Sequence, residues 1–349
     1  MKKNLNRRGF VKTTLLGGIG LGLVGNMTSI YGKTGSSTRR IGIIGLDTSH
    51  STEFTKAFND IAAIPELGGY KVVAAYPRGS NDIKSSYERI PGYTDEVRKL
   101  GVEIVSSIEE LLSKVDVVLL ETNDGRLHLQ QALQVFKSGK RMFIDKPMTA
   151  SLTDAITIFE AARHYNVPVF SSSSLRFEQV TQEIAGGKIG KVLGADTFSP
   201  ATIEKTHPDL FWYGIHGVES LFTLMGTGCK SVSRTYTENT DSVVGVWNDN
   251  RIGTFRGTRS GVYGIGGIAF GEKGNLTLGG TLGYKELLIK IVEFFNTGIV
   301  PVKAEETLEI FGFMQAAQES RLNGGASVNI ESELHKAKRK VKMSFKNEL

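Results

Sequence analysis

Cysteine is almost absent from this chain, since Cys229 is the single one among 349 residues. A lone cysteine excludes an intrachain disulfide and is usually a small buried hydrophobic residue. Acidic residues are absent from residues 1–35, which carry six lysines and arginines. The formal net charge of +6 comes from that segment, because the remainder has 36 basic and 36 acidic residues. A neutral remainder gives no reason to expect a nucleic-acid partner.

Two kinds of catalytic signature are also missing. No serine lies in a Gly-x-Ser-x-Gly turn, which argues against a serine hydrolase. His207, His216 and Glu219 lie near one another in the sequence, but no spacing among them requires a metal ion. We therefore predict no metal site. The length suits two domains, and the composition (40% hydrophobic, 22% charged) is that of an ordinary globular protein.

Residues 1–35 have the pattern of an export signal. Arg7 and Arg8 precede the uncharged run 13–30, which is rich in glycine and leucine. A basic head followed by a mildly apolar stretch is typical of secretory signals, and paired arginines with Phe10 two places on resemble a twin-arginine signal. We expect the twin-arginine machinery to export the chain to a bacterial periplasm. An uncleaved anchor is the alternative, although about 18 residues with many glycines make a poor spanning helix.

The segment 41–50, IGIIGLDTSH, passes from a buried strand through a polar turn into a helical pattern. The N-terminus of a helix at such a corner binds anions, most often a dinucleotide pyrophosphate. The candidate residues are Gly45, Leu46, Asp47, Thr48, Ser49 and His50. A Gly-x-Gly-x-x-Gly fingerprint would place glycine at 47 and 50, and Asp47 would repel phosphates unless it points away. A strand–turn–helix without a nucleotide stays open.

Strands and helices alternate through residues 39–171, which predicts a doubly wound parallel sheet of the Rossmann type. The expected strands are residues 70–76, 102–105, 115–121, 142–144 and 167–170, and the expected helices are 51–63, 108–112, 127–137 and 152–164. After the strand 70–76 comes Arg78 and Ser80 rather than an acid. An acid there would bind the ribose of NAD, so Arg78 and Ser80 favour the 2′-phosphate of NADP. A solvated arginine is the alternative.

Residues 172–349 are predicted to form a second, α+β domain. Short apolar or alternating runs separated by turn residues, with no helix-length pattern between 232 and 278, indicate an open antiparallel sheet. Helices are expected over 214–225, 285–295 and 305–322. The basic run 335–342, HKAKRKVK, is interpreted as a solvated tail or an edge strand.

Several segments together carry a family resemblance. They are Thr122-Asn123 with His128, Gly139-Lys140 through Asp145-Lys146-Pro147-Met148, Leu175-Arg176-Phe177, residues 187–194 (GKIGKVLG), and Gly214-x-His216-x-x-Glu219. In these segments the chain resembles the Gfo/Idh/MocA oxidoreductases over about residues 39–330. Asn123 replaces a usual proline, Asp145 a glutamate, Glu219 an aspartate, and Trp212 the first aspartate of the last motif.

The resemblance implies roles for individual residues. Thr122, Asn123, His128 and Asp145 would help bind the cofactor, Lys146 and His216 would be catalytic, and Arg176, Tyr213 and Glu219 would bind substrate. The open sheet of this family often packs on a second subunit, so a homo-oligomer is expected. A lone histidine near a helix start is often structural, which is the alternative for His216.

The leading hypothesis is a periplasmic, nicotinamide-dependent oxidoreductase that acts on a hydroxyl of a sugar, polyol or glycoside. Free nicotinamide cofactors are not available in the periplasm, so the NADP or NAD would be tightly bound before export. The competing hypothesis is a carbohydrate-binding or accessory protein that has lost its cofactor, motivated by Asp47 and His50 in place of glycines.

Overall fold

The computed structural model describes residues 39–279 and 283–348, so the predicted export signal lies outside the described residues. The first sheet is parallel throughout, with the order β3-β2-β1-β4-β5-β6. Its strands are β1 (Arg39–Ile44), β2 (Tyr70–Tyr76), β3 (Glu103–Ile104), β4 (Val117–Leu120), β5 (Met142–Ile144) and β6 (Val169–Ser171). The predicted Rossmann-type sheet is confirmed.

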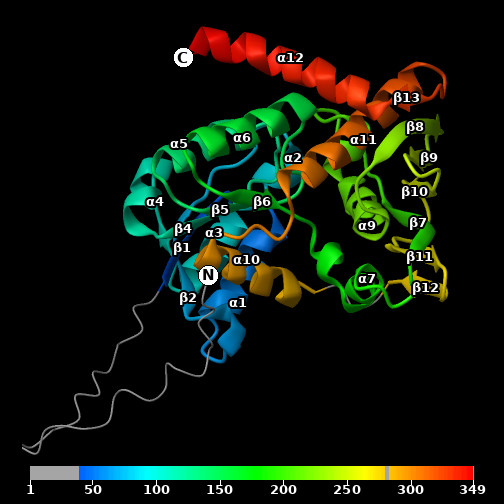
Figure 1. Ribbon diagram of the computed structural model, residues 1–349. Coiled ribbons are helices and arrows are strands. Elements are labelled where there is room, and N and C mark those ends of the chain that lie inside the picture. The colour runs from blue at the N-terminus through cyan, green and yellow to red at the C-terminus, as the bar shows by residue number, and fades with distance from the viewer. Residues whose placement is uncertain (1–38, 280–282, 349) are drawn as a thin grey trace, which may run out of the picture. The chain divides into compact units, whose positions relative to one another are not determined.

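Helices cover both faces of this sheet (Figure 1). They are α1 (Ser49–Asn59), α2 (Lys84–Tyr87), α3 (Ile90–Lys99), α4 (Ile108–Lys114), α5 (His128–Lys137) and α6 (Leu152–His164). On one face Phe54 and Phe58 of α1 join the core with Ile41 and Ile43 of β1. Helices α4, α5 and α6 pack on the other face. Strands buried on both faces read as continuous apolar runs, which is why they could be predicted.

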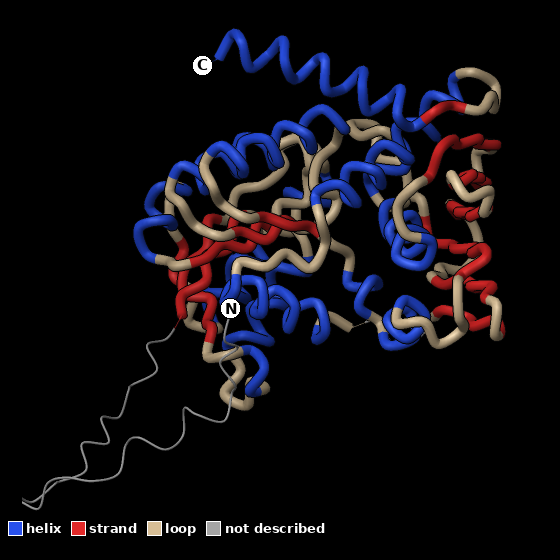
Figure 2. Tube along the Cα trace, viewed as in Figure 1, coloured by secondary structure: helices blue, strands red, loops and turns tan. Residues whose placement is uncertain are grey.

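The second sheet has seven strands in the order β12-β11-β7-β10-β9-β8-β13. They are β7 (Val192–Pro200), β8 (Cys229–Tyr236), β9 (Thr240–Trp247), β10 (Ile252–Thr258), β11 (Gly266–Gly271), β12 (Gly274–Leu278) and β13 (Val328–Asn329). The predicted open antiparallel sheet is confirmed, with one parallel pairing in it, that of β7 with β10. Helices α8 and α9 and the strands β8 and β9 separate β7 from β10 in the sequence (Figure 2). Because the two paired strands are so far apart, no local sequence pattern predicts their pairing.

The helices of this half are α7 (Gln179–Ala185), α8 (Asp209–Trp212), α9 (Ile215–Met225), α10 (Lys285–Thr297), α11 (Ala304–Leu322) and α12 (Ile330–Glu348). Two short 3-10 helices complete the described chain, Pro65–Leu67 before β2 and Ser174–Phe177 before α7. Helices α9 and α11 pack on the second sheet. Within the described residues, no helix is both long and apolar enough to span a membrane.

Two elements differ from the sequence-based expectation. Helix α10 leaves the second sheet and buries Ile291 and Phe294 in the core beneath the first sheet, so a boundary at residue 172 does not separate two independent cores. The run 335–342 is neither tail nor edge strand but part of α12. Ile330, Ala337 and Val341 of α12 are buried at helical spacing, and α12 lies along α6 and α11.

Candidate active site

The turn between β1 and α1 begins at Gly45, whose φ of 91° favours glycine. A Cβ at this position would lie 2.5 Å from the backbone of Thr122 at the end of β4. The backbones of the two strand ends therefore touch. The first turn of α1 carries no side-chain cap, because the N-cap residue Thr48 makes no capping hydrogen bond. Its amide groups remain available for an anion.

Asp47 points away from this turn and is fully buried. Its carboxylate accepts hydrogen bonds from the backbone N–H groups of Ser80 (3.0 Å) and Asn123 (2.9 Å). It lies so close to Gly79 that a Cβ there would be 2.0 Å from Oδ2. Burial raises the pKa of Asp47, and the two amide donors oppose that rise. Asp47 thus ties together the loops that follow β2 and β4, and it does not face the cavity described next.

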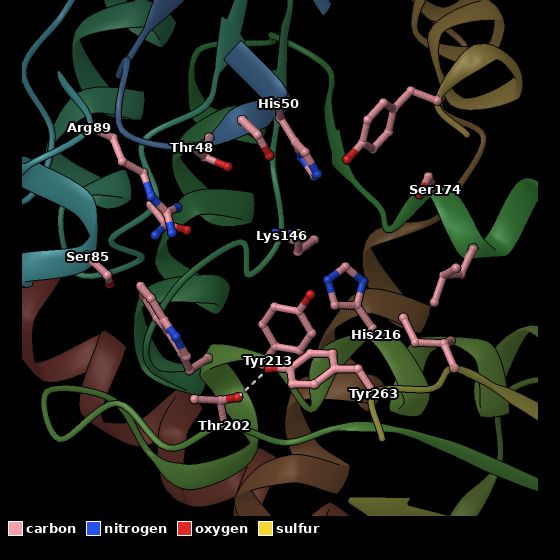
Figure 3. Close-up of a pocket in the computed structure, with 16 residues that line it drawn as sticks. Thr48, His50, Ser85, Arg89, Lys146, Ser174, Thr202, Tyr213, His216 and Tyr263 are labelled. Carbon is pink, nitrogen blue, oxygen red and sulfur yellow. Dashed lines mark hydrogen bonds between the residues drawn. The ribbon is translucent and has the colours of Figure 1, made fainter. Parts of the chain in front are cut away.

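A cavity of about 480 Å³ opens in front of the α1 turn (Figure 3). It is lined by Thr48, Ser49, His50, Ser85, Arg89, Asn123, Lys146, Ser174, Leu175, Thr202, Trp212, Tyr213, His216, Tyr263, Ile265 and Tyr284. We call Thr48, Ser49, Ser85, Arg89 and Asn123 the outer end of the cavity, and His50, Lys146, Tyr213 and His216 the inner end. Figure 3 shows Lys146 between His50 and His216, with Arg89 and Ser85 on the far side.

Lys146 and His216 come from opposite halves of the fold. Lys146 follows β5 at the carboxyl edge of the first sheet, and His216 lies in the first turn of α9. Each side chain is only 9% exposed, yet both line the cavity. The sequence-predicted pair is therefore brought together.

The environment of His216 keeps its ring neutral. Burial, followed by the charge of Lys146, lowers the pKa of His216 well below its ordinary value. Its Nδ1 is hydrogen-bonded to the hydroxyl of Ser173 at 2.8 Å. With the ring proton on Nδ1, Nε2 can accept a proton; with the proton on Nε2, the Ser173 hydroxyl donates to Nδ1. The ring can thus serve proton transfer in either direction.

His50 and Asp145 form a buried contact beneath the inner end. His50 Nδ1 lies 2.9 Å from Asp145 Oδ2, and Lys146 Nζ lies 3.7 Å from the same oxygen. Although burial alone would raise the pKa of Asp145, the charges of His50 and Lys146 hold it below its ordinary value. Asp145 does not line the cavity, so it supports His50 and Lys146 rather than facing a ribose.

Two of the residues predicted to bind the 2′-phosphate lie elsewhere. Ser80 is fully buried, and its hydroxyl donates to Asp82 and accepts from the backbone of Ile83. Arg78 is exposed and is not part of the cavity lining. Arg89, near the start of α3, instead lines the outer end. Arg89 and Ser85, rather than Arg78 and Ser80, therefore line the cavity on this side.

His128 and Thr122 hold the loop after β4. Both ring nitrogens of His128 contact backbone carbonyl oxygens, those of Met148 at 2.9 Å and Thr122 at 2.6 Å. His128 is fully buried and absent from the cavity lining, as are Thr122, Gly45 and Leu46. Of this predicted group, Asn123 reaches the outer end, along with Thr48, Ser49 and His50 from the α1 turn.

Arg176 and Glu219, predicted to bind substrate, are engaged with each other. Arg176 Nε donates to Glu219 at 2.8 Å, and Arg176 also pairs with Glu306 of α11. Glu219 further accepts from Ser172 Oγ and from the backbone N–H of Ser173. Neither residue is among those that line the cavity. They fix the segment that carries Ser173, and Tyr213 is the predicted substrate residue that does face the cavity.

Sequence reasoning missed part of the lining. Arg89 is the N-cap residue of α3, a helix whose polar sequence carries a weak helical pattern, and Tyr284 precedes α10. Thr202 follows β7, Tyr263 lies between β10 and β11, and their hydroxyls are hydrogen-bonded at 2.9 Å (Figure 3). Glu121 was interpreted only as a strand end, although a glutamate closing an apolar run VDVVLL is a signal of a buried charge.

The residues present fit a dinucleotide at the outer end. An uncapped helix N-terminus, the hydroxyls of Thr48, Ser49 and Ser85 and the guanidinium of Arg89 surround one part of the cavity. Backbone donors together with an arginine are the chemistry that phosphates require. The carboxylate of Asp47 is turned away and bonded, so it does not oppose an anion there.

A parallel sheet with a helix N-terminus at its switch point is the architecture of a doubly wound Rossmann-type fold, and here helix α9 of the second half adds His216 beside it. Residues 39–173 match the Gfo/Idh/MocA family, described as an oxidoreductase family with an NAD-binding Rossmann fold. This stretch of the chain is therefore similar to the NAD-binding Rossmann fold of that family.

Similar proteins extend the comparison. The chain is 32% identical over 122 residues to a 1,5-anhydro-D-fructose reductase of Ensifer adhaerens, and 26% identical over 155 residues to an uncharacterized oxidoreductase of Streptococcus pneumoniae. These matches cover 33% and 39% of this chain, and 36% and 42% of those two proteins, respectively. The chain thus spans well under half the length of the curated relatives it matches.

Solved structures share the whole fold. A probable dehydrogenase from Thermotoga maritima aligns with 84% of this chain and 99% of its own, at a TM-score of 0.68 and 20% identity. Scyllo-inositol dehydrogenase from Lactobacillus casei, solved with bound NAD(H) and scyllo-inositol, gives the same coverage and TM-score at 17% identity. At these identities the likeness establishes the fold alone.

Proposed function

We propose that this protein is a nicotinamide-dependent oxidoreductase of the Gfo/Idh/MocA type that acts on a hydroxyl of a sugar, polyol or glycoside. The observation that carries the proposal is the meeting of Lys146 and His216, from the two halves of the fold, in one cavity that also reaches the N-terminus of α1. A phosphate-binding corner at one end and a proton-transfer pair at the other is the layout that hydride transfer from a dinucleotide requires.

The side chains at the inner end would share the work. The nicotinamide, when bound, supplies hydride transfer to or from the substrate carbon. Lys146 donates a hydrogen bond to the substrate oxygen and stabilises the negative charge that develops on it. His216, kept neutral by burial, accepts the hydroxyl proton in the oxidation or returns it in the reduction. Tyr213, with its ring centroid 5.0 Å from that of His216, forms an apolar wall beside the ring.

The cofactor is proposed to be NADP(H) rather than NAD(H), and to be tightly held. Arg89 lines the outer end just after the region where an acid would bind the ribose of NAD. The nearest acid on this segment, Asp82, is engaged by Arg126 at 2.5 Å and by the Ser80 hydroxyl. An arginine at this position complements a 2′-phosphate.

Nucleotide released from the denatured protein tests the proposal directly. The full chain, purified without added cofactor and then unfolded, should release one NADP(H) per chain, identified by absorbance and mass. Reduction of the bound nucleotide by candidate sugars and inositols in a single turnover would then define the substrate class. If neither NADP(H) nor NAD(H) is released and neither binds on addition, the carbohydrate-binding alternative is supported instead. His50, packed between Phe54 and Tyr284 where a glycine was expected, is the observation that keeps this alternative in view.

The proposed compartment is the periplasm, reached through the twin-arginine pathway. The support is sequence-based: Arg7 and Arg8 ahead of an uncharged stretch, and a neutral charge balance beyond residue 35. Replacing both arginines with lysine should leave the protein in the cytoplasm while the parent is exported. Equal export of the two proteins would reject the twin-arginine assignment.

A homo-oligomer formed through the outer face of the second sheet is also proposed. Leu193, Phe198 and Ile252 on that sheet are each 41–53% exposed, which is unusual for large apolar side chains on strands. Light scattering of the purified chain tests this proposal, with Ile252→Lys as the variant that should dissociate the assembly. A monomeric parent would overturn it.

A further inference from the structure

A cluster of three potential metal ligands lies beneath the inner end of the cavity. His50 comes from the first turn of α1, Glu121 follows β4 and Asp145 follows β5. One ligand atom from each lies within 4.8 Å of the other two, and all three side chains are buried. Three neighbouring elements thus direct a nitrogen and two carboxylates at one point.

The side chain of Glu121 has no partner at this point. It is fully buried, and within residues 39–279 and 283–348 neither of its carboxylate oxygens has a hydrogen-bond partner; Asp145 Oδ1 also has none there. An ionised carboxylate in such a place costs several kcal/mol unless a counter-charge accompanies it. The nitrogens of His50 and Lys146 both lie near Asp145 Oδ2, at 2.9 Å and 3.7 Å, whereas no basic group of the described residues forms an ion pair with Glu121. The carboxylate of Glu121 must therefore be either protonated or bound to a cation.

The geometry favours a cation. A proton on Glu121 would leave a buried O–H group without an acceptor, because neither carboxylate oxygen has a hydrogen-bond partner among the described residues, and an unsatisfied buried donor destabilises the fold. His50 Nδ1 approaches Asp145 Oδ2 to 2.9 Å, but the contact lacks the alignment of a hydrogen bond. Ligand atoms bound at about 2.0–2.2 Å to one zinc ion lie roughly 3–3.5 Å apart without being hydrogen-bonded to each other. In the structure one pair, His50 Nδ1 and Asp145 Oδ2, lies at 2.9 Å, and all three ligand atoms lie within 4.8 Å of one another, so small side-chain movements would bring them onto one ion.

We propose that His50, Glu121 and Asp145 bind one first-row divalent cation. Because His50 lines the cavity, the open coordination position of the ion would face the cavity. One imidazole and two carboxylates suit Zn²⁺, Mn²⁺ or Fe²⁺. The proposal departs from the sequence-based expectation of no metal, because Glu121 was not recognised and His50 was judged only as a missing glycine. Metal binding does not depend on the proposed nucleotide chemistry, although an ion here would polarise a substrate oxygen near Lys146.

Zinc binding by the full chain tests the site. The protein is stripped with a chelator, loaded with Zn²⁺ and desalted, and its metal content and titration calorimetry are measured. We expect one Zn²⁺ per chain in the parent. Glu121→Gln, which keeps the shape but removes the charge, should weaken binding by more than about 100-fold, since even loss of a supporting residue around a metal costs 10–100-fold. His335→Gln, on an exposed histidine of α12, is the matched control and should bind as the parent does.

Thermal unfolding, measured with and without Zn²⁺, distinguishes a folded variant that has lost the metal site from a misfolded one. Zn²⁺ should raise the melting temperature of the parent and of His335→Gln, and should leave Glu121→Gln and His50→Gln unchanged. Less than one-tenth of a Zn²⁺ per chain in the parent, or equal retention by folded Glu121→Gln, would overturn the proposal and leave a proton as the companion of Glu121. Nucleotide binding is measured separately on the stripped protein, so its failure would reject the proposed function without affecting the metal result.

Discussion

The two ends of the cavity are built differently. At the outer end Ser49, Ser85 and Arg89 are exposed, and they come from one half of the fold. At the inner end His50, Lys146 and His216 are each 8–9% exposed, and they come from both halves. The orientation of exposed donors is set by few neighbouring residues, so they can adjust to a ligand when it binds. Buried groups held by Asp145 and Ser173 are oriented before a ligand arrives, which is what proton transfer requires.

The largest expected effect is on chemistry at the inner end. Lys146→Met and His216→Asn should each slow reduction of the bound nucleotide by about 10²–10⁴-fold, the usual cost of losing a positioned proton-transfer or charge-stabilising group. Single-turnover kinetics measure this step, and nucleotide content measured on the same samples is the control. Near-parental rates in both variants would show that the inner end does not carry the chemical step.

The next effect is on stability, at the junction behind the outer end. Asp47→Ala leaves the backbone N–H groups of Ser80 and Asn123 buried without an acceptor. Each unsatisfied group costs about 1–3 kcal/mol, so the free energy of unfolding should fall by roughly 2–5 kcal/mol in urea titrations. Asp82→Ala, on an exposed carboxylate of the same loop, is the control and should cost less than about 1 kcal/mol. Equal losses in the two variants would mean that Asp47 does not hold the loops together.

At the outer end the expected effect is on affinity alone. Arg89→Ala should weaken NADP binding by about 10–150-fold, corresponding to 1.5–3 kcal/mol for a charge-assisted contact, and leave the single-turnover rate at saturation unchanged. Arg78→Ala, exposed and outside the lining, is the matched control and should change binding less than about twofold. A larger effect at Arg78 than at Arg89 would restore the sequence-based assignment.

The smallest effect is a pH dependence from His216. Its pKa in the folded protein lies below the ordinary value of 6.5, so below pH 6.5 the unfolded chain binds more protons at this residue than the folded one. Its contribution to stability is therefore full above pH 6.5 and is lost as the pH falls toward the folded-state pKa. Between pH 7.5 and 5.5 the free energy of unfolding of the parent should fall by more than that of His216→Asn, by at most about 1.4 kcal/mol. Identical slopes in urea titrations would show that folding does not shift the pKa of His216.

The parallel sheet could be predicted because its signals are local. Strand 70–76 and strand 142–144 agree with the structure at both ends, since a strand buried on both faces is a short apolar run. Helices α2 and α3 were missed because their exposed faces dominate their composition, with Val97 the fully buried apolar residue of α3. The parallel pairing of β7 with β10 depends on residues more than fifty positions apart, which no local pattern encodes.

The site was predicted unevenly for a related reason. Lys146 and His216 were found because each lies in a motif that the resemblance supplied, and the structure brings them together. Glu219 and Arg176 carry equally plausible side chains, but they neutralise each other in the interior, which a sequence cannot reveal. Arg89 was missed because its place in the lining depends on how α3 folds back toward α1, and these two helices are in contact.

The return of α10 to the first sheet has a practical consequence for dissecting the molecule. Ile291, Phe294 and Phe295 supply part of the core against Tyr70 and Phe170, although they lie more than 120 residues beyond them in the sequence. A fragment ending near residue 172 would leave that apolar surface open to water and prone to aggregation. Domain exchange with a related enzyme would likewise have to transfer residues 285–302 together with the Rossmann half, as a discontinuous unit.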